Sequence, residues 1–106
     1  MEIHHAKKVV IITEKLISES VCELIKDSHA SGYTICNVGG SSERNVKSSD
    51  DGASVVGDFS NVKIEAILKD QDEALHLIEM VVDEFFTDFS GICFIEDVQV
   101  LRTSKF

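Results

Sequence analysis

The side chains best suited to chemistry lie in one polar segment, residues 39–60, which reads GGSSERNVKSSDDGASVVGDFS. The segment begins with the adjacent glycines Gly39 and Gly40 and continues with three side chains of types that commonly bind phosphate, Arg44, Asn45 and Lys47. Glycine lets a ligand approach the backbone closely, successive N–H groups in such turns form anion-binding concavities, and arginine holds phosphate oxygens in a bidentate fork. We therefore interpret the segment as a loop that responds to a phosphate-bearing ligand.

Two other interpretations of this segment remain open. Paired glycines followed by two cations fall short of a complete phosphate-loop fingerprint, so a solvated hairpin loop fits the pattern as well. Asp50 and Asp51 could hold Mg²⁺ through their carboxylates, which leaves slow nucleotide hydrolysis as an enzymatic alternative. The length of the segment favours a functional role for it, because unstructured connections beyond roughly 12–15 residues are usually functional or disordered.

The other reactive side chains form no second constellation. No histidine lies near the loop serines, and His4–His5 is interpreted as a flexible tail. The cysteines, which have no C-x-x-C spacing, are predicted to be small buried hydrophobes in a reducing compartment; they are Cys22, Cys36 and Cys93. The sequence therefore predicts neither catalytic residues, nor a metal site, nor a cofactor.

Length and charge narrow the class of protein. The 106 residues suit a single domain spanning 1–106, since domains commonly hold about 100–150 residues. With 10 basic and 19 acidic residues the formal charge is −9, the opposite of a nucleic-acid-binding footprint. No stretch approaches the ~20 apolar residues of a membrane helix, so we expect a cytoplasmic protein.

Hydrophobic periodicity predicts four strands and two helices. Continuous or alternating β-rich runs indicate strands at 7–13, 33–38, 61–69 and 91–101. Between the first two strands, apolar residues at helical spacing predict a helix with Thr13 as its N-cap and Gly32 as a left-handed C-terminus; its apolar residues are Leu16, Ile17, Val21, Leu24 and Ile25.

The second helix begins after the third strand. Asp70 with Glu73 three residues later resembles a capping box, and the helix carries two neighbouring apolar stripes. One stripe is Leu75, Ile78, Val82 and Phe86, and the other is Leu77, Val81 and Phe85. This broad apolar face is expected to pack on the sheet.

The order β-α-β-β-α-β predicts an α+β, ferredoxin-like domain with one antiparallel four-stranded sheet and two helices. Such a sheet has two free edges and one uncovered face, which favours assembly of several copies. If subunits meet edge to edge, the second and fourth strands border a common cleft. Backbone groups there could hydrogen-bond a purine edge while Arg44 and Lys47 bind its phosphate.

The chain resembles the PII signal-transduction superfamily over about residues 7–101. The runs that carry the resemblance are VVIITEKL, GYTICNVGGSSERNVKSS, NVKIEAIL and SGICFIEDVQVL. The Gly-Gly and Arg-Asn-Val-basic-Ser-Ser pattern is most similar to the PII-like branch of SbtB type. The resemblance implies a homotrimer that binds adenine nucleotides (AMP, cyclic AMP, ADP or ATP) between subunits. It also implies a T-loop at about 41–60 that regulates a membrane bicarbonate transporter of SbtA type.

The resemblance assigns roles to individual residues. Gly39 and Gly40 would line the cleft, and the loop residues Arg44, Asn45 and Lys47 would contact phosphate. The looser matches to cleft positions are Thr34, Glu65, Gly91 and Ile92, and Arg102 remains as a cation near the C-terminus. Few cations surround the phosphate, which favours a mono- or diphosphate. A CutA-like trimer with a metal-related or structural role remains as a further alternative.

Overall fold

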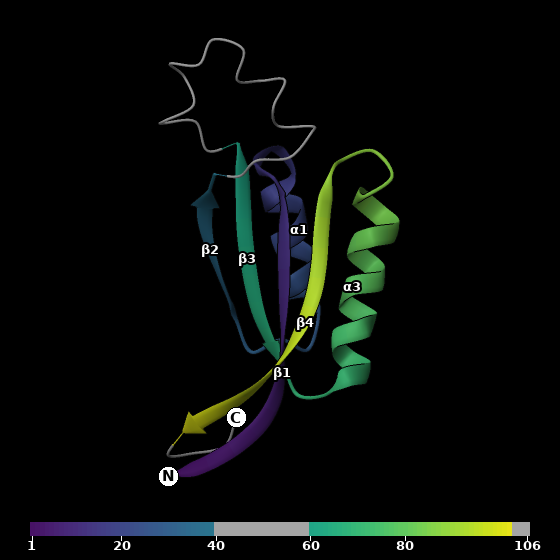
Figure 1. The fold of residues 1–106 in the computed structure, drawn as a ribbon. Coiled ribbons are helices and arrows are strands. Elements are labelled where there is room, and N and C mark those ends of the chain that lie inside the picture. The colour runs from purple at the N-terminus through teal and green to yellow at the C-terminus, as the bar shows by residue number, and fades with distance from the viewer. Residues whose placement is uncertain (40–59, 103–106) are drawn as a thin grey trace.

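The computed structural model describes residues 1–39 and 60–102, and shows a four-stranded antiparallel sheet with two helices (Figure 1). The elements are β1 (Glu2–Glu14), a 3-10 turn (Lys15–Ile17), α1 (Ser18–Lys26), β2 (Tyr33–Val38), β3 (Asn61–Leu68), α3 (Gln71–Phe85) and β4 (Gly91–Arg102). The predicted ferredoxin-like βαββαβ order is confirmed.

The strands follow the order β2-β3-β1-β4, and each neighbouring pair is antiparallel. β1 and β2 therefore run in the same direction, with β3 between them. This split arrangement follows from the connections, because β1 and β2 are joined through a helix whereas β2 and β3 are joined directly. β2 and β4 form the two edges of the sheet.

The hydrophobic core lies between one face of the sheet and the two helices. Along β3 the burial alternates, as a period of two requires when one face is packed. The core includes Val9, Ile11, Val21, Ile25, Val62, Ile64, Ala66, Leu68, Ala74, Leu77 and Val81. Both α1 and α3 contribute to it, so the helices cover the same face.

The opposite face of the sheet carries no helix among the described residues. Glu65 is one of the alternate residues of β3 that point away from the core. Cross-strand partners share a face, so Val10 and Phe94 lie on the same face as Glu65. Val10 is only 1% exposed, whereas Phe94 is 40% and Ile92 57% exposed. We call this surface the open face; it carries apolar side chains that the single chain leaves in contact with solvent.

The N-terminus is a strand, so the prediction of a flexible tail at His4–His5 is wrong. Residues 2–6 pair with residues 98–102, because β4 continues to Arg102 and offers them backbone partners. β3 ends at Leu68, opposite Lys7, one residue before the predicted end. Residues 2–6 and 98–102 therefore form a two-stranded arm that projects from the sheet (Figure 1).

The ends of α1 also differ from the prediction. Thr13 is buried in β1 and its hydroxyl donates to the Ser90 carbonyl oxygen at 2.8 Å, so Thr13 does not cap the helix. A 3-10 turn intervenes, and Leu16 in it is exposed. The helix ends at Lys26, and no described glycine has a positive φ. Gly32 therefore does not form the predicted left-handed terminus.

The cap of α3 is confirmed, and its predicted apolar face packs on the core except at Leu75 and Val82. Asp70 Oδ1 accepts the Glu73 N–H at 2.9 Å. The buried stripe is Ala74, Leu77 and Val81, whereas Leu75 and Val82 are exposed. Successive residues are about 100° apart around a helix, so a helix that turns Leu77 and Val81 to the sheet turns Leu75 and Val82 away.

Candidate functional site

Six of the predicted site residues fall within the described ranges. They are Thr34, Gly39, Glu65, Gly91, Ile92 and Arg102. The other four, Gly40, Arg44, Asn45 and Lys47, lie outside the described residues. The described part of the site therefore consists of strands and strand ends, and its geometry comes from the register of the sheet.

Gly39 and Gly91 lie at the same end of the sheet but on opposite edges. Val38 of β2 pairs with Asn61, Asn61 with Glu14, and Thr13 with Gly91. Two strands separate the edges, so three strand spacings of about 4.8 Å place them roughly 14 Å apart. One chain alone does not enclose a ligand between Gly39 and Gly91.

Thr34 and Glu65 are cross-strand partners on the open face. The Glu65 carboxylate lies 3.2 Å from Lys8 Nζ and 3.8 Å from Lys63 Nζ. Lys8 Nζ also lies 3.3 Å from Glu96 Oε1. We call Lys8, Lys63, Glu65 and Glu96 the open-face charge network. Sequence reasoning missed both lysines, although alternation along β3 puts Lys63 on the same face as Glu65.

The open-face charge network is electrically balanced, with two cations and two carboxylates. Hydrogen bonds to Glu65 and then to Glu96 raise the pKa of Lys8 above its ordinary value, so its ammonium group stays charged over the whole physiological range. The chain as a whole has a formal charge of −9, but the carboxylate of Glu65 is neutralised by the neighbouring ammonium groups of Lys8 and Lys63.

Gly91 lies in close contact with Phe86. A Cβ at Gly91 would overlap the ring of Phe86 and would lie 3.0 Å from the Ile12 carbonyl oxygen. The glycine thus lets the end of α3 close over the first residue of β4. Ile92, the next residue, is 57% exposed and pairs with Ile12 on the open face.

Arg102 lies apart from the other described site residues. It ends β4, pairs with Glu2 and belongs to the two-stranded arm. At about 3.3 Å per residue, the strand places Arg102 roughly 35 Å from Gly91. Within one chain, Arg102 cannot contact a ligand bound at Gly91.

The cysteines differ in exposure: Cys22 is buried, Cys93 is half-buried and Cys36 is exposed. The prediction that all three are buried is therefore wrong for Cys36, whose strand β2 is an edge of the sheet. Cys36 pairs with Lys63 and lies on the open face. Burial raises the pKa of the Cys93 thiol to about 11.

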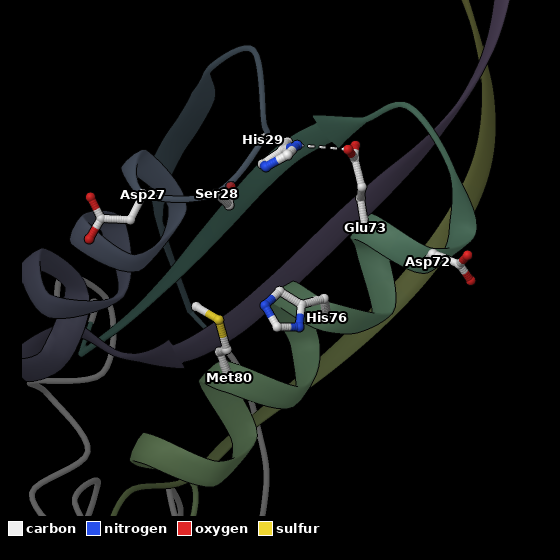
Figure 2. A pocket seen from close by; sticks show the side chains of 7 residues that line it. All are labelled: Asp27, Ser28, His29, Asp72, Glu73, His76 and Met80. Carbon is white, nitrogen blue, oxygen red and sulfur yellow. Dashed lines mark hydrogen bonds and ion pairs between the residues drawn. The ribbon is translucent and has the colours of Figure 1, made fainter.

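A cavity of about 280 Å³ lies away from the predicted site, between the end of α1 and the first turns of α3 (Figure 2). Its lining residues are Asp27, Ser28, His29, Asp72, Glu73, His76 and Met80. His29 Nδ1 lies 2.9 Å from Glu73 Oε2, while Asp27 and Asp72 stand at opposite ends of the view. Within residues 1–39 and 60–102, no group of three or more His, Cys, Asp and Glu side chains could hold a metal ion.

Comparison with known proteins identifies a matching family and several similar structures. A model of the family "Nitrogen regulatory protein P-II" matches residues 6–105. The chain is similar to a PII-like signalling protein from Thermus thermophilus, with 25% identity, TM-score 0.74, and coverage of 95% of this chain and 94% of the other.

A second similar structure is that of CPII from Thiomonas intermedia, a nitrogen regulatory PII-like protein bound to ADP, AMP and bicarbonate. It has 25% identity and TM-score 0.73, over 97% of this chain and all of CPII. The Bacillus subtilis GlnK–ATP complex has 17% identity and TM-score 0.56, over 89% of this chain and 82% of GlnK, and supports the fold alone. No helix in the described ranges is long and apolar enough to cross a membrane.

Proposed function

Since the chain belongs to the nitrogen regulatory protein P-II family, a family of signalling proteins, we propose that it senses adenine nucleotides. The observation that carries this proposal is the placement of Gly39 and Gly91 at one end of the sheet, on opposite edges. In this proposal the ligand lies between the β2 edge of one subunit and the β4 edge of another, where it can touch Gly39 of one copy and Gly91 of the next.

The proposed assembly is a homotrimer. The single chain leaves two free edges and an open face with exposed Ile92 and Phe94. A contact between two different edges is heterologous, and it generates a closed ring when the rotation that relates neighbouring subunits closes after a full turn. Three subunits related in this way form a trimer. Each cleft in such a ring combines Thr34, Gly39 and Glu65 of one copy with Gly91 and Ile92 of the next.

The proposed ligand is AMP or ADP, because CPII, which is similar to this chain over its whole length, is bound to ADP and AMP. Gly39 and Gly40 approach the ligand through their backbone, and Arg44, Asn45 and Lys47 bind its phosphate. These groups supply few positive charges, so we expect ATP to bind no more tightly than ADP. Cyclic AMP belongs to the same chemical class and is included in the test.

The proposed output is the conformation of the T-loop, residues 41–60. A ligand shifts the loop only by its differential affinity for the two loop states. The finer assignment to the SbtB-type branch rests on the Arg-Asn-Val-basic-Ser-Ser pattern. It makes the partner a membrane bicarbonate transporter of SbtA type, to which a cytoplasmic trimer is recruited at the inner face of the membrane.

In this proposal the nucleotide is an effector and not a substrate. The test combines light scattering, which measures the mass of the assembly, with calorimetric titration of AMP, cyclic AMP, ADP and ATP. A trimer that binds AMP or ADP at up to millimolar concentration supports the proposal. A monomer, or no heat with any of the four nucleotides, refutes it. Recovery of intact ADP after long incubation with Mg²⁺ distinguishes a sensor from a slow hydrolase.

A further inference from the structure

The open-face charge network connects three strands through one side chain. Lys8 lies on the central strand β1, and its Nζ reaches Glu65 on β3 at 3.2 Å and Glu96 on β4 at 3.3 Å. The Lys8 side chain is 27% exposed, less than either carboxylate partner. The lysine is therefore held between two acceptors, and Glu65 has a fixed cationic partner.

This arrangement matters because Glu65 on β3 is the cross-strand partner of Thr34 on β2, the edge strand that the proposed function gives to the nucleotide. An unpaired carboxylate beside the cleft would add negative charge next to a phosphate-bearing anion and weaken its binding, since like charges repel. The chain as a whole is also acidic. Neutralising the charge of Glu65 and fixing its orientation would therefore favour a phosphate-bearing ligand at this site.

We propose that Lys8 is a positioning residue for the nucleotide site, which neutralises Glu65 and holds it in place. Lys8 acts through Glu65 and does not touch the ligand. Lys63, at 3.8 Å from Glu65 Oε2, is the more distant and more exposed of the two lysines, so it supplies the smaller share of the neutralisation. The inference rests on the proposed function, because it requires a phosphate-bearing ligand near Glu65.

The test compares Lys8→Met with Lys7→Met in titrations with AMP and with adenosine. Lys7 is the adjacent residue on β1, has its own carboxylate partner in Asp97, and points to the other face. Both variants change the net charge equally. We expect Lys8→Met to weaken AMP about tenfold and adenosine less than threefold, whereas Lys7→Met leaves both nearly unchanged. Lys8→Arg restores most of the AMP affinity, because it keeps the cation.

A double-mutant cycle tests whether Lys8 acts through Glu65. In the Glu65→Gln background the carboxylate is absent, so Lys8→Met should cause less than a twofold further loss of AMP affinity. Three results would each overturn the inference while leaving the nucleotide sensor intact. They are equal losses of AMP affinity in both backgrounds, equal effects of Lys7→Met and Lys8→Met, and unchanged AMP binding by a folded Lys8→Met variant. A wild-type protein that binds no nucleotide overturns both.

Discussion

The Glu14 carboxylate accepts two hydrogen bonds from Ser90, one from its backbone N–H at 2.7 Å and one from its hydroxyl at 3.2 Å. These two residues are far apart in sequence, and Ser90 directly precedes Gly91. The end of β1 therefore fixes the turn that leads into β4. Together with the bond from Thr13 to the Ser90 carbonyl oxygen, the contact holds one edge of the proposed nucleotide cleft in position.

Glu14→Ala removes both hydrogen bonds and should lower the free energy of unfolding by about 1–2 kcal/mol, as expected for charge-assisted bonds in a partly buried site. Urea denaturation measures the change. Glu19→Ala, an exposed acid on α1, is the matched control and should change stability by less than about 0.5 kcal/mol. Equal midpoints for Glu14→Ala and wild type would show that the contact contributes nothing.

Gly91→Ala should destabilise the protein by about 1–3 kcal/mol, because the added methyl group displaces the Phe86 ring or shifts β4. Gly32→Ala is the control: a Cβ there meets nothing within 4 Å, and Gly32 has no positive φ. It should be neutral or stabilising by up to about 1 kcal/mol. Thermal unfolding of both variants checks the pair, and a neutral Gly91→Ala would contradict the packing assigned to Phe86.

Leu77→Ala should cost about 2–5 kcal/mol, since Leu77 is fully buried and its truncation leaves a cavity. Leu75→Ala, on the neighbouring face of α3, removes a side chain that is 41% exposed and should cost less than about 1 kcal/mol. Chemical denaturation distinguishes them. The reverse order would mean that α3 is rotated on the sheet, or that another copy covers Leu75.

Cys93 gives the protein a predictable loss of stability at alkaline pH. Burial raises the pKa of its thiol from 9.0 to about 11. Below pH 9 the thiol is protonated in the folded and unfolded states alike; between pH 9 and 11 only the unfolded state ionises, so the free energy of unfolding falls as pH rises. Two pKa units correspond to ~2.7 kcal/mol, and partial exposure reduces the loss to about 1–2 kcal/mol.

Denaturation at pH 8.5 and pH 10.5 measures this loss in the wild type and in Cys93→Ala. The wild type should lose about 1–2 kcal/mol more than the variant over this interval. Identical pH dependence of the two proteins would show that the thiol is not shielded from water in the folded state.

Strand pattern and order were predictable from the sequence because they depend on local periodicity. Tyr33–Val38 has its predicted bounds, and burial alternates along β3 as Val62, Ile64, Ala66 and Leu68 indicate. The fold class followed from the order of these elements. The cap at Asp70 was predictable as well, since its partner is only three residues away.

The errors arise where a residue's environment depends on distant parts of the chain. Residues 2–6 are polar enough to suggest a tail, yet β4 provides them with backbone partners. Thr13 has the chemistry of an N-cap, but its hydroxyl bonds to Ser90 instead. The pairing of Lys8 with Glu65 and Glu96 joins three strands and requires the sheet register, which single-chain periodicity does not supply.

In the proposed function the glycine-rich loop binds the phosphate of an adenine nucleotide. Calorimetric titration of the wild type and Arg44→Ala with AMP and with adenosine tests this binding most directly. AMP should bind the wild type and weaken by about 1.5–3 kcal/mol in Arg44→Ala, as expected for loss of a charge-assisted contact, while adenosine binding barely changes. Equal AMP affinity in both proteins, or no AMP binding to the wild type, would contradict the proposed phosphate binding.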